Sequence, residues 1–541
     1  MARKVTPVKK RGSSEAEQAQ TRMKMFYERR HPMYDELLPH WEFLESCYSG
    51  GRNWFAPNIF RYFKEGDGEY TDRLSRAYRF NHTREVVELV QKYLFKATIT
   101  RAVDAPQELQ NFWKRATRAG GSISQLMGRA STASSISGRC AIVVDNNIPA
   151  EVEVSGEKRA LNQAELASGK YRVYAYVVPA RHILDYAFDE DGDGELLWIK
   201  LREVVRDDAD PHGSSGLTVN RVRLWTRTDW ELYEEVEQTG TSAGRDKGSI
   251  TIKLEDSGAH NLGFVPVRLL DHIPGEDPYN PPGLIDEIAY LDRAVANYLS
   301  SLDAIIQDQT FSQLAIPAAS IMPGDDAHKT VLSMGTKRVF TYDGGAGSSA
   351  SPHFLAPDPK QAGVILSVIN KIINEIYHTV GLAGERTKED NSVGIDNSSG
   401  VAKAYDFERV NSLLLSKAQA CQSVENWIGR TVLAWWRKTD ETDYVRYPTT
   451  FDVMRLVDDL VTAEALAKLQ APAEVRRAQM KQMIEKLLPH LTAEEIKTIE
   501  ADIEKWLENP EVEMPPSLLN PGSKPVSAQS RQGEVTAATK K

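Results

Sequence analysis

The stretch GLIDEIAYLDRAVANYLSSLDAIIQD, residues 283–308, decides the fold of this chain. Its apolar residues alternate between four- and three-residue spacing through three heptads, which predicts a narrow apolar seam along one helix. At the usual rise per residue this helix is about 35–40 Å long. The residues of the seam are Leu284, Ile288, Leu291, Val295, Tyr298, Leu302 and Ile305.

The opposite face of the same predicted helix is acidic, and its only base is Arg293. Such a charged face is usually solvated. The acids on it are Asp286, Glu287, Asp292, Asp303 and Asp308.

A second helix is predicted from about Gln361 to Val380 by the spacing of Ile365, Ile369, Ile372 and Ile376. Between the two helices, residues 310–359 are rich in Pro, Gly and Ser and contain short strand-like pieces such as Lys337–Tyr342. Two long helices therefore flank one compact excursion.

A polar loop at residues 384–399 follows, and a loop of this length inside a folded protein is usually functional or disordered. A very long helix is predicted from about Ser399 to Lys438, and a strand-like piece at 444–453 comes after it. Three further helices are expected near 455–470, 473–488 and 492–508, the last with a capping box of Thr492 and Glu495.

The N-terminal half mixes helices with short strands. A basic start precedes helical text from Ser14 to about Cys47, and further helices are predicted at 82–97, 106–118 and 123–138. A strand at Cys140–Asp145 leads into β-rich text up to residue 273, which predicts one small, largely antiparallel sheet. Its other strands are expected at 171–178, 196–204, 221–226, 230–236, 249–254 and 265–270.

One acidic turn, residues 189–195, has two interpretations. Asp189, Asp191, Asp193 and Gly194 match positions 1, 3, 5 and 6 of a calcium-binding EF-hand loop. Position 12 is Lys200, however, and strand-like text stands on both sides where an EF-hand has helices. The pattern therefore favours a hairpin turn.

The composition excludes several classes of protein. A chain of 541 residues is long enough for several packed regions. Its formal net charge of −10 argues against a uniformly basic coat on nucleic acid. With only three cysteines and no CxxC or Cys/His cluster, neither a zinc site nor a disulfide framework is predicted. The sequence also has no apolar run long enough for a membrane span and no signal peptide, which predicts a soluble protein that does not contact membranes.

Motifs of catalysis are missing from the sequence. There is no P-loop, HExxH, GxSxG or GxGxxG in its strand context, and the eleven histidines are scattered. We therefore expect no cofactor, no bound metal and no enzymatic activity.

Three short motifs, in their order along the chain, resemble those of tailed-bacteriophage portal proteins, the ring-shaped head-to-tail connectors. The resemblance spans roughly residues 20–508 and rests on element order as much as on the motifs, none of which is diagnostic alone. The motifs are Gly283-Leu-Ile-Asp-Glu-Ile-Ala-Tyr-Leu-Asp292, Ile373-Asn-Glu-Ile-Tyr377 with Gly381-Leu382, and Asn397-Ser-Ser-Gly-Val-Ala-Lys403.

The resemblance implies a mainly helical α+β fold with an α/β wing, a stem, a clip and a helical crown. The wing would be residues 20–283, the stem helices 284–309 and 360–381, the clip 310–359, and the channel loop 382–399. Residues 400–453 would hold the long helix and the return to the wing, and 454–508 the crown. A disordered basic arm at 1–19 and a disordered tail at 509–541 complete the chain.

The resemblance also implies a closed ring of twelve copies at one capsid vertex, located in the virion and, during assembly, in the host cytoplasm. Double-stranded DNA would pass through the ring during packaging and ejection. Its protein partners would be the terminase, the major capsid protein, a scaffold protein and a head-tail adaptor, and the ring would nucleate capsid assembly.

If the acidic helix face lines such a channel, its repulsion of phosphates keeps DNA centred and prevents tight binding. The alternative is that these acids face solvent or bases of a neighbouring subunit. The polar loop adds a mixed set of charges that argues against tight gripping of DNA. These loop residues are Glu385, Arg386, Lys388, Glu389, Asp390 and Asp396.

Two competing functions differ from the portal in what they predict. Another structural or adaptor protein of virions would differ in its symmetry and its place in the particle. A metal-dependent nuclease or an NTPase with unrecognised motifs would show DNA cleavage or nucleotide hydrolysis.

Overall fold

The computed structural model describes residues 15–451 with gaps, and five isolated positions beyond them (475, 477, 480, 499 and 501). The gaps are 97, 149–151, 155–156, 160–170, 193, 238–249, 274–278, 311–312, 318–338, 343–350, 356–358, 383–399 and 450. Residues 1–451 and 452–541 form two separate compact units. The start of the basic arm, the 384–399 loop, nearly all of the predicted crown with its capping box, and the tail lie outside the described residues.

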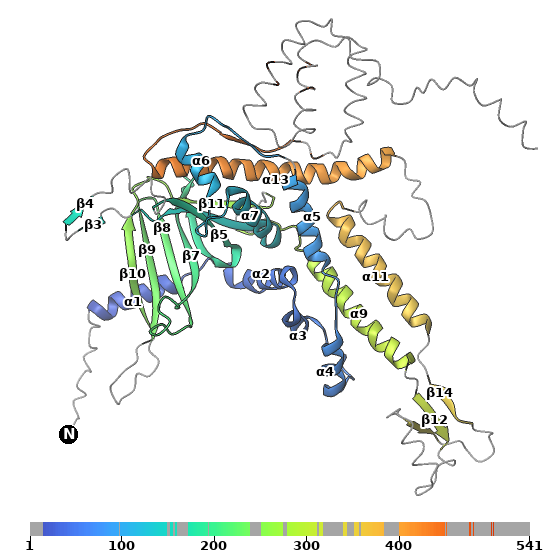
Figure 1. Cartoon of the computed structure of the whole chain (residues 1–541). Coiled ribbons are helices and arrows are strands. Elements are labelled where there is room, and N and C mark those ends of the chain that lie inside the picture. The colour runs from blue at the N-terminus through green and yellow to red at the C-terminus, as the bar shows by residue number, and fades with distance from the viewer. Residues whose placement is uncertain are drawn as a thin grey trace, which may run out of the picture. The chain divides into compact units, whose positions relative to one another are not determined.

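The described part has a mixed α+β fold (Figure 1). Where one small sheet was predicted, two antiparallel sheets are present, and one of their strands, β6, was not predicted at all. The five-stranded sheet has the order β10-β9-β8-β7-β6, with β6 Ile183–Phe188, β7 Leu196–Arg206, β8 Thr218–Thr226, β9 Asp229–Glu237 and β10 Ile250–Ala259. The three-stranded sheet has the order β11-β2-β5, with β2 Arg139–Asn146, β5 Val173–Pro179 and β11 Val267–Asp271.

Strand β2 explains why there are two sheets. Successive side chains of a strand point to opposite faces. Ala141 and Val143 belong to a core shared with Ile199 and Trp225 of the five-stranded sheet. The alternate residues, including Cys140, lie in a second core built with helices. A strand buried on both faces is apolar at every position, and such a run does not reveal that a second sheet covers it.

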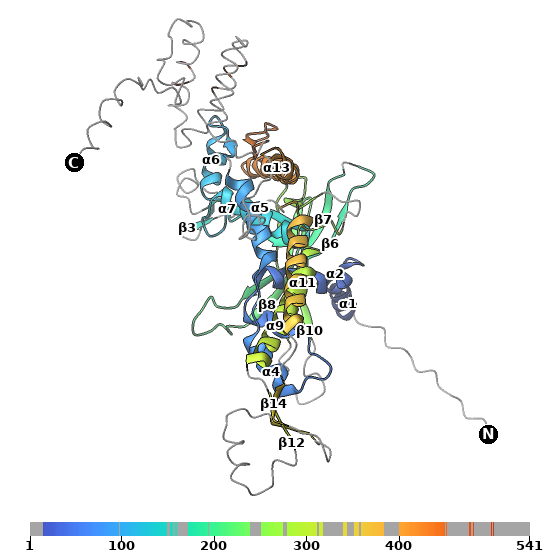
Figure 2. The same ribbon diagram turned by 90° about the vertical axis from the view of Figure 1, so that its right-hand side faces the viewer.

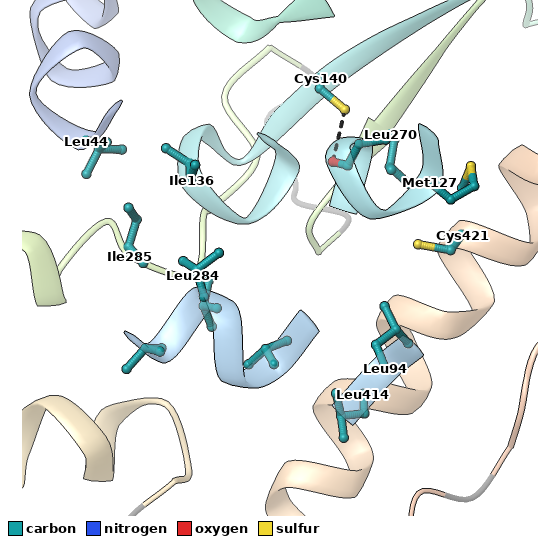
Figure 3. Close-up of a cluster of buried hydrophobic side chains, with 14 of the residues drawn as sticks. Leu44, Leu94, Met127, Ile136, Cys140, Leu270, Leu284, Ile285, Leu414 and Cys421 are labelled. Atoms are coloured by element: carbon teal, nitrogen blue, oxygen red, sulfur yellow. Dashed lines mark hydrogen bonds between the residues drawn. The ribbon is translucent and has the colours of Figure 1, made fainter. Parts of the chain in front are cut away.

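The helical core packs α7 (Ile123–Ser137) and α13 (Gly400–Trp435) against the three-stranded sheet, and α5 (His82–Lys96) against these two helices. Figure 3 shows Leu94 of α5 near Leu414 of α13, and Met127 of α7 near Cys421 of α13, all within this core. All three cysteines are free and buried. Burial raises the pKa of the Cys421 thiol to about 12, so this thiol stays protonated and unreactive at neutral pH.

Helix α13 is attached to this layer by a buried lysine. The Nζ atom of Lys417 lies 2.5 Å from Ser135 Oγ and 3.3 Å from Ser134 Oγ, both on α7, and 2.7 Å from Nδ1 of His272, next to β11. No carboxylate contacts this ammonium group among the described residues. Burial lowers the pKa of Lys417 to about 8, and it lowers the pKa of His272 well below its ordinary value.

This environment predicts a pH-dependent difference between the wild type and Lys417→Met. Below about pH 8 the folded wild type carries an unfavourable buried charge, and this penalty disappears as pH rises towards the ordinary lysine value. The free energy of unfolding of the wild type, relative to that of the variant, should therefore increase by about 2–3 kcal/mol between about pH 7.5 and pH 10. Urea unfolding of both proteins at the two pH values measures this change.

Lys371→Met, on the exposed face of α11, is the matched control and should show no such pH-dependent difference from the wild type. Comparison of variants also cancels the titration of the buried thiols and tyrosines that both proteins share. If the difference in the free energy of unfolding between wild type and Lys417→Met stayed constant over this pH range, burial would not disfavour the charged form of Lys417.

The N-terminal helical text forms two helices, α1 (Glu15–Glu28) and α2 (Tyr34–Ser49), where one continuous stretch was predicted. Pro32 lies in the break, and proline disfavours helical backbone at the residue before it. Helix α1 starts at Glu15, so residues 15–19 do not belong to the disordered arm that we expected. The Nζ atom of Lys200, on β7, donates to the carbonyls of Phe26, Tyr27 and Arg29 at the C-terminal end of α1.

The two helices of the predicted stem are present as α9 (Ile288–Thr310) and α11 (Pro359–Thr379), which pack side by side (Figures 1 and 2). Helix α9 starts four residues later than the predicted seam, because the chain bends at Leu284 and Ile285 and turns at Asp286 and Glu287. Most of the seam is buried, with Val295 and Leu302 nearly inaccessible, but Tyr298 is 40% exposed and does not belong to it. Leu299 takes its place in the core.

A small sheet connects the ends of α9 and α11. Strand β12 (Gln313–Pro317) pairs parallel with β13 (Val339–Tyr342) and antiparallel with β14 (His353–Leu355). Of the predicted strand-like pieces, Lys337–Tyr342 corresponds to β13.

The remaining described elements are short. The predicted strand at 444–453 is reduced to β15 (Val445–Arg446), which pairs with β1 (Thr100–Arg101). A separate hairpin joins β3 (Val152–Val154) and β4 (Glu157–Arg159). The other helical pieces are η1 Arg52–Trp54, α3 Phe55–Asn58, α4 Asp67–Arg76, α6 Gln107–Lys114 and η2 Ala180–His182.

Candidate functional site

Helix α11 has an exposed outer face in the α9–α11 hairpin. Its inner face is buried through Ile369, Ile373, Ile376 and Tyr377. Its outer residues recur at three- and four-residue steps over 21 residues, which is about 30 Å of helix. The polar residues of this outer face are Lys360, Gln361, Ser367, Asn370, Lys371, Asn374, Glu375, His378 and Thr379.

This outer face carries almost no net charge. Its charged side chains are two lysines and one glutamate, and the rest of its polar groups are amides, hydroxyls and one histidine. A surface of this kind can form hydrogen bonds with water or with a passing ligand, but it offers no cluster of cations for stable binding to phosphates. Sequence patterns identified the buried face of this helix and did not single out the exposed one.

Asp292 does not lie on the exposed acidic face that we expected, because it is fully buried. Its Oδ2 accepts hydrogen bonds from Thr83, at 2.7 Å from Oγ1 and 3.3 Å from the backbone nitrogen. Nη1 of Arg79, whose side chain is also buried, is 3.9 Å away. The carboxylate therefore holds the start of α5 against α9, and the sequence gives no sign of this pairing across 209 positions.

Two other predicted acids have partners within the chain. Asp286 Oδ2 accepts a hydrogen bond of 2.7 Å from the backbone nitrogen of Gly283, and its Oδ1 lies 3.6 Å from His40. Asp303 Oδ2 is 3.2 Å from Nε of Arg76 on α4. Both carboxylates are about one-third exposed or less, so their charge is partly compensated before any ligand arrives.

Glu287 is exposed, and no ion pair is found for it among the described residues. The side chain of Asp308 lies outside the described residues, as do Glu385, Arg386, Lys388, Glu389, Asp390 and Asp396 of the polar loop. Of the predicted site residues, the structure thus brings none together in a common cluster among those that it describes.

The acidic turn at 189–195 is a hairpin turn, as the pattern favoured. It joins β6 and β7, which pair antiparallel. Its acids contact arginines: Asp189 Oδ2 is 3.4 Å from Arg227, and Glu195 is 2.9 Å from Arg268. Nowhere in the described part do three His, Cys, Asp or Glu side chains gather closely enough to hold a metal ion.

Among the described helices, none is both long and apolar enough to cross a lipid bilayer.

No protein-family model matches the sequence, and no curated protein matches it. Solved structures with some similarity include the neck of an empty gene transfer agent particle, determined with C6 symmetry, at 11% identity and a TM-score of 0.33. That alignment covers 78% of this chain and 90% of the other. The virion of a native gene transfer agent particle gives 11% identity and a TM-score of 0.36, over 81% of this chain and 98% of the other. Because both TM-scores are below 0.5, neither similarity defines the function of this chain.

Proposed function

We propose that this chain is a portal protein of a tailed bacteriophage, which forms a closed ring through which double-stranded DNA enters and leaves the capsid. The observation that carries the proposal is the α9–α11 pair, two long antiparallel helices joined at one end by the β12–β14 sheet and followed in sequence by α13. This is the element order that the resemblance to portal proteins implies for the stem, the clip and the long helix.

The surface of the α9–α11 pair fits a wall past which DNA slides. Binding of DNA grows with the number of lysines and arginines that neutralise phosphates, and the outer face of α11 has only two lysines over about 30 Å. In a ring, this face would repeat around the bore. We therefore propose a nearly neutral wall in place of the strongly acidic wall suggested by the α9 sequence, since Asp286, Asp292 and Asp303 are paired or buried.

The remaining roles follow from the same proposal. Terminase and head-tail adaptor would dock on the β12–β14 end, the capsid protein and scaffold would surround the ring, and the polar 384–399 loop would approach DNA. We propose that the protein does this without catalysis, and that a separate ATPase powers packaging.

Electron microscopy of the purified chain tests the proposal directly. We expect top views to classify as closed rings of twelvefold symmetry with a bore wide enough for a duplex, which is about 20 Å across. Closed rings of another symmetry and no such bore would favour a different virion protein, such as an adaptor. A compact dimer that cleaves DNA with a metal ion or hydrolyses nucleotides would contradict the proposal and would indicate a nuclease or an NTPase.

A further inference from the structure

A cavity of about 940 Å³ that is open to solvent lies between helices α5 and α7, and no residue of the α9–α11 pair lines it. Its walls come from the last turns of α5, residues 98–101 with strand β1, nearly the whole length of α7, and Tyr48 of α2. Small-molecule sites in proteins usually have volumes of about 300–1,000 Å³. The cavity is therefore large enough for a ligand of the size of a nucleotide.

The charged residues that line this cavity are all basic. They are Lys96, Arg101 and Arg129, and none of the described lining residues is acidic. Lys96 and Arg129 are exposed, and neither forms an ion pair within the described part of the chain. In a protein of net charge −10, three bases around one cavity without an acid on its walls indicate an anionic ligand.

Arg101 is the most buried of the three bases, and its guanidinium is only partly satisfied. Its Nε donates to Glu425 at 2.7 Å, and Glu425 also accepts a hydrogen bond from Tyr447. Nη2 of Arg101 is buried and has no hydrogen-bond partner among the described residues. A buried donor without a partner is unfavourable, and the guanidinium that carries it lies on the wall of the cavity.

Further donors line the same cavity. Thr98, Ser124 and Gln125, whose side chains carry hydrogen-bond donors, are among its lining residues. Ser124 lies in the first turn of α7, a 15-residue helix whose N-terminal end carries partial positive charge. Cations, hydroxyls and an amide on several sides suit a group with more oxygens than a carboxylate, and a phosphate has three or four.

The cavity also has an apolar side. Phe95 and Tyr48 line it together with Ile99 and Ile136. An aromatic side chain provides a flat surface on which a nucleobase can stack. We propose that this cavity binds the phosphate group of a nucleotide, either free or within a nucleic-acid strand, with its base against the aromatic side.

Calorimetric titration of the full chain with inorganic phosphate, deoxyadenosine monophosphate and a short single-stranded oligonucleotide tests this inference. We expect the mononucleotide to bind and inorganic phosphate to compete with it more weakly. Lys96→Gln combined with Arg129→Gln should weaken binding of the mononucleotide by about tenfold or more, since each loses a charge-assisted contact. Both residues are exposed, so the double variant should fold.

Lys92→Gln is the matched control, because Lys92 is exposed on α5, one turn before Lys96, and does not line the cavity. It should change affinity by less than about twofold.

The comparison of ligands identifies the source of the phosphate. An oligonucleotide that binds more tightly than the mononucleotide, with strong dependence on salt, indicates a nucleic-acid strand; equal affinity indicates a free nucleotide. No binding of all three ligands at about 10 mM, or an equal loss in Lys92→Gln, would overturn the inference. Ring formation is measured separately by microscopy, so intact rings without binding would remove only this site.

Discussion

Asp292→Ala is expected to destabilise the protein by about 3–5 kcal/mol, because it leaves the buried guanidinium of Arg79 without its carboxylate. The Arg79 side chain is 5% exposed, and its Nη1 has no hydrogen-bond partner among the described residues. The same substitution also removes the acceptor of the Thr83 hydroxyl at the start of α5. The midpoint of urea unfolding, followed by tryptophan fluorescence, measures the loss.

The Arg79 guanidinium also lies 4.0 Å from the centre of the Trp54 ring, and Trp54 is one of the ten tryptophans that contribute to the fluorescence signal. Asp292→Asn separates the effect of charge from that of shape, because it keeps the volume and an acceptor for Thr83. It should therefore destabilise the protein less than Asp292→Ala does.

Glu287→Ala is the control, because Glu287 is an exposed acid in the turn before the same helix. It should shift stability by no more than about 0.5 kcal/mol. If Asp292→Ala were as stable as Glu287→Ala, the contact between Asp292 and Arg79 would not stabilise the fold. The sequence-based expectation that Asp292 lies on an exposed channel face would then be open again.

Lys200→Met is expected to release helix α1 from the five-stranded sheet. Lys200 is fully buried, and its ammonium lies 2.5 Å, 3.0 Å and 2.6 Å from the carbonyl oxygens of Phe26, Tyr27 and Arg29. The last carbonyls of a helix have no partner within the helix. Methionine fills the same space without a donor, so these oxygens would stay buried and unpaired.

Lys200→Met is expected to lower the free energy of unfolding by about 3 kcal/mol. This is less than the sum expected for three separate charge-assisted hydrogen bonds. Burial lowers the pKa of Lys200 to about 8, so removal of the charge also removes a desolvation penalty. Amide hydrogen exchange in α1 should become about 100-fold faster, while exchange in β2 should change little.

Lys253→Met is the matched control on the same sheet, where Lys253 is an exposed residue of β10 that pairs with Glu255. In the Lys253→Met variant, the backbone amides of α1 should exchange at the wild-type rate. Unchanged protection of α1 in Lys200→Met would mean that contacts such as Arg29 with Asp185 and the Phe26 and Tyr233 rings hold the helix without the lysine.

The position of the acids changes the electrostatic picture of the proposed channel. From sequence, the α9 helix has five acids on one face, and a ring would multiply this charge. In the structure, Asp292 is buried, Asp303 is paired with Arg76, and Asp286 closes the turn before the helix. In the proposed channel, the remaining wall would be the outer face of α11, which has few charges and also exposes Val364 and Leu366. Such a wall would let DNA pass because it does not bind DNA, more than because it repels it.

The sequence by itself determined the long helices and most of the strands. Helices α5, α7, α11 and α13 lie within a few residues of their predicted positions, because their apolar residues repeat with the helical period over many turns. It also determined that the turn at 189–195 is a hairpin, since Lys200 stands where an EF-hand needs a carboxylate. The break between α1 and α2 was missed, although Pro32 marks it.

Only the tertiary structure decided which polar residues are buried and what they contact. Asp292 with Thr83, Lys417 with Ser135 and His272, and Lys200 with the end of α1 join positions more than 100 residues apart. A periodic pattern reports which side of an element faces a core, but not which element forms that core. The split into two sheets and the basic cavity between α5 and α7 depend on long-range packing, which is why local sequence did not reveal them.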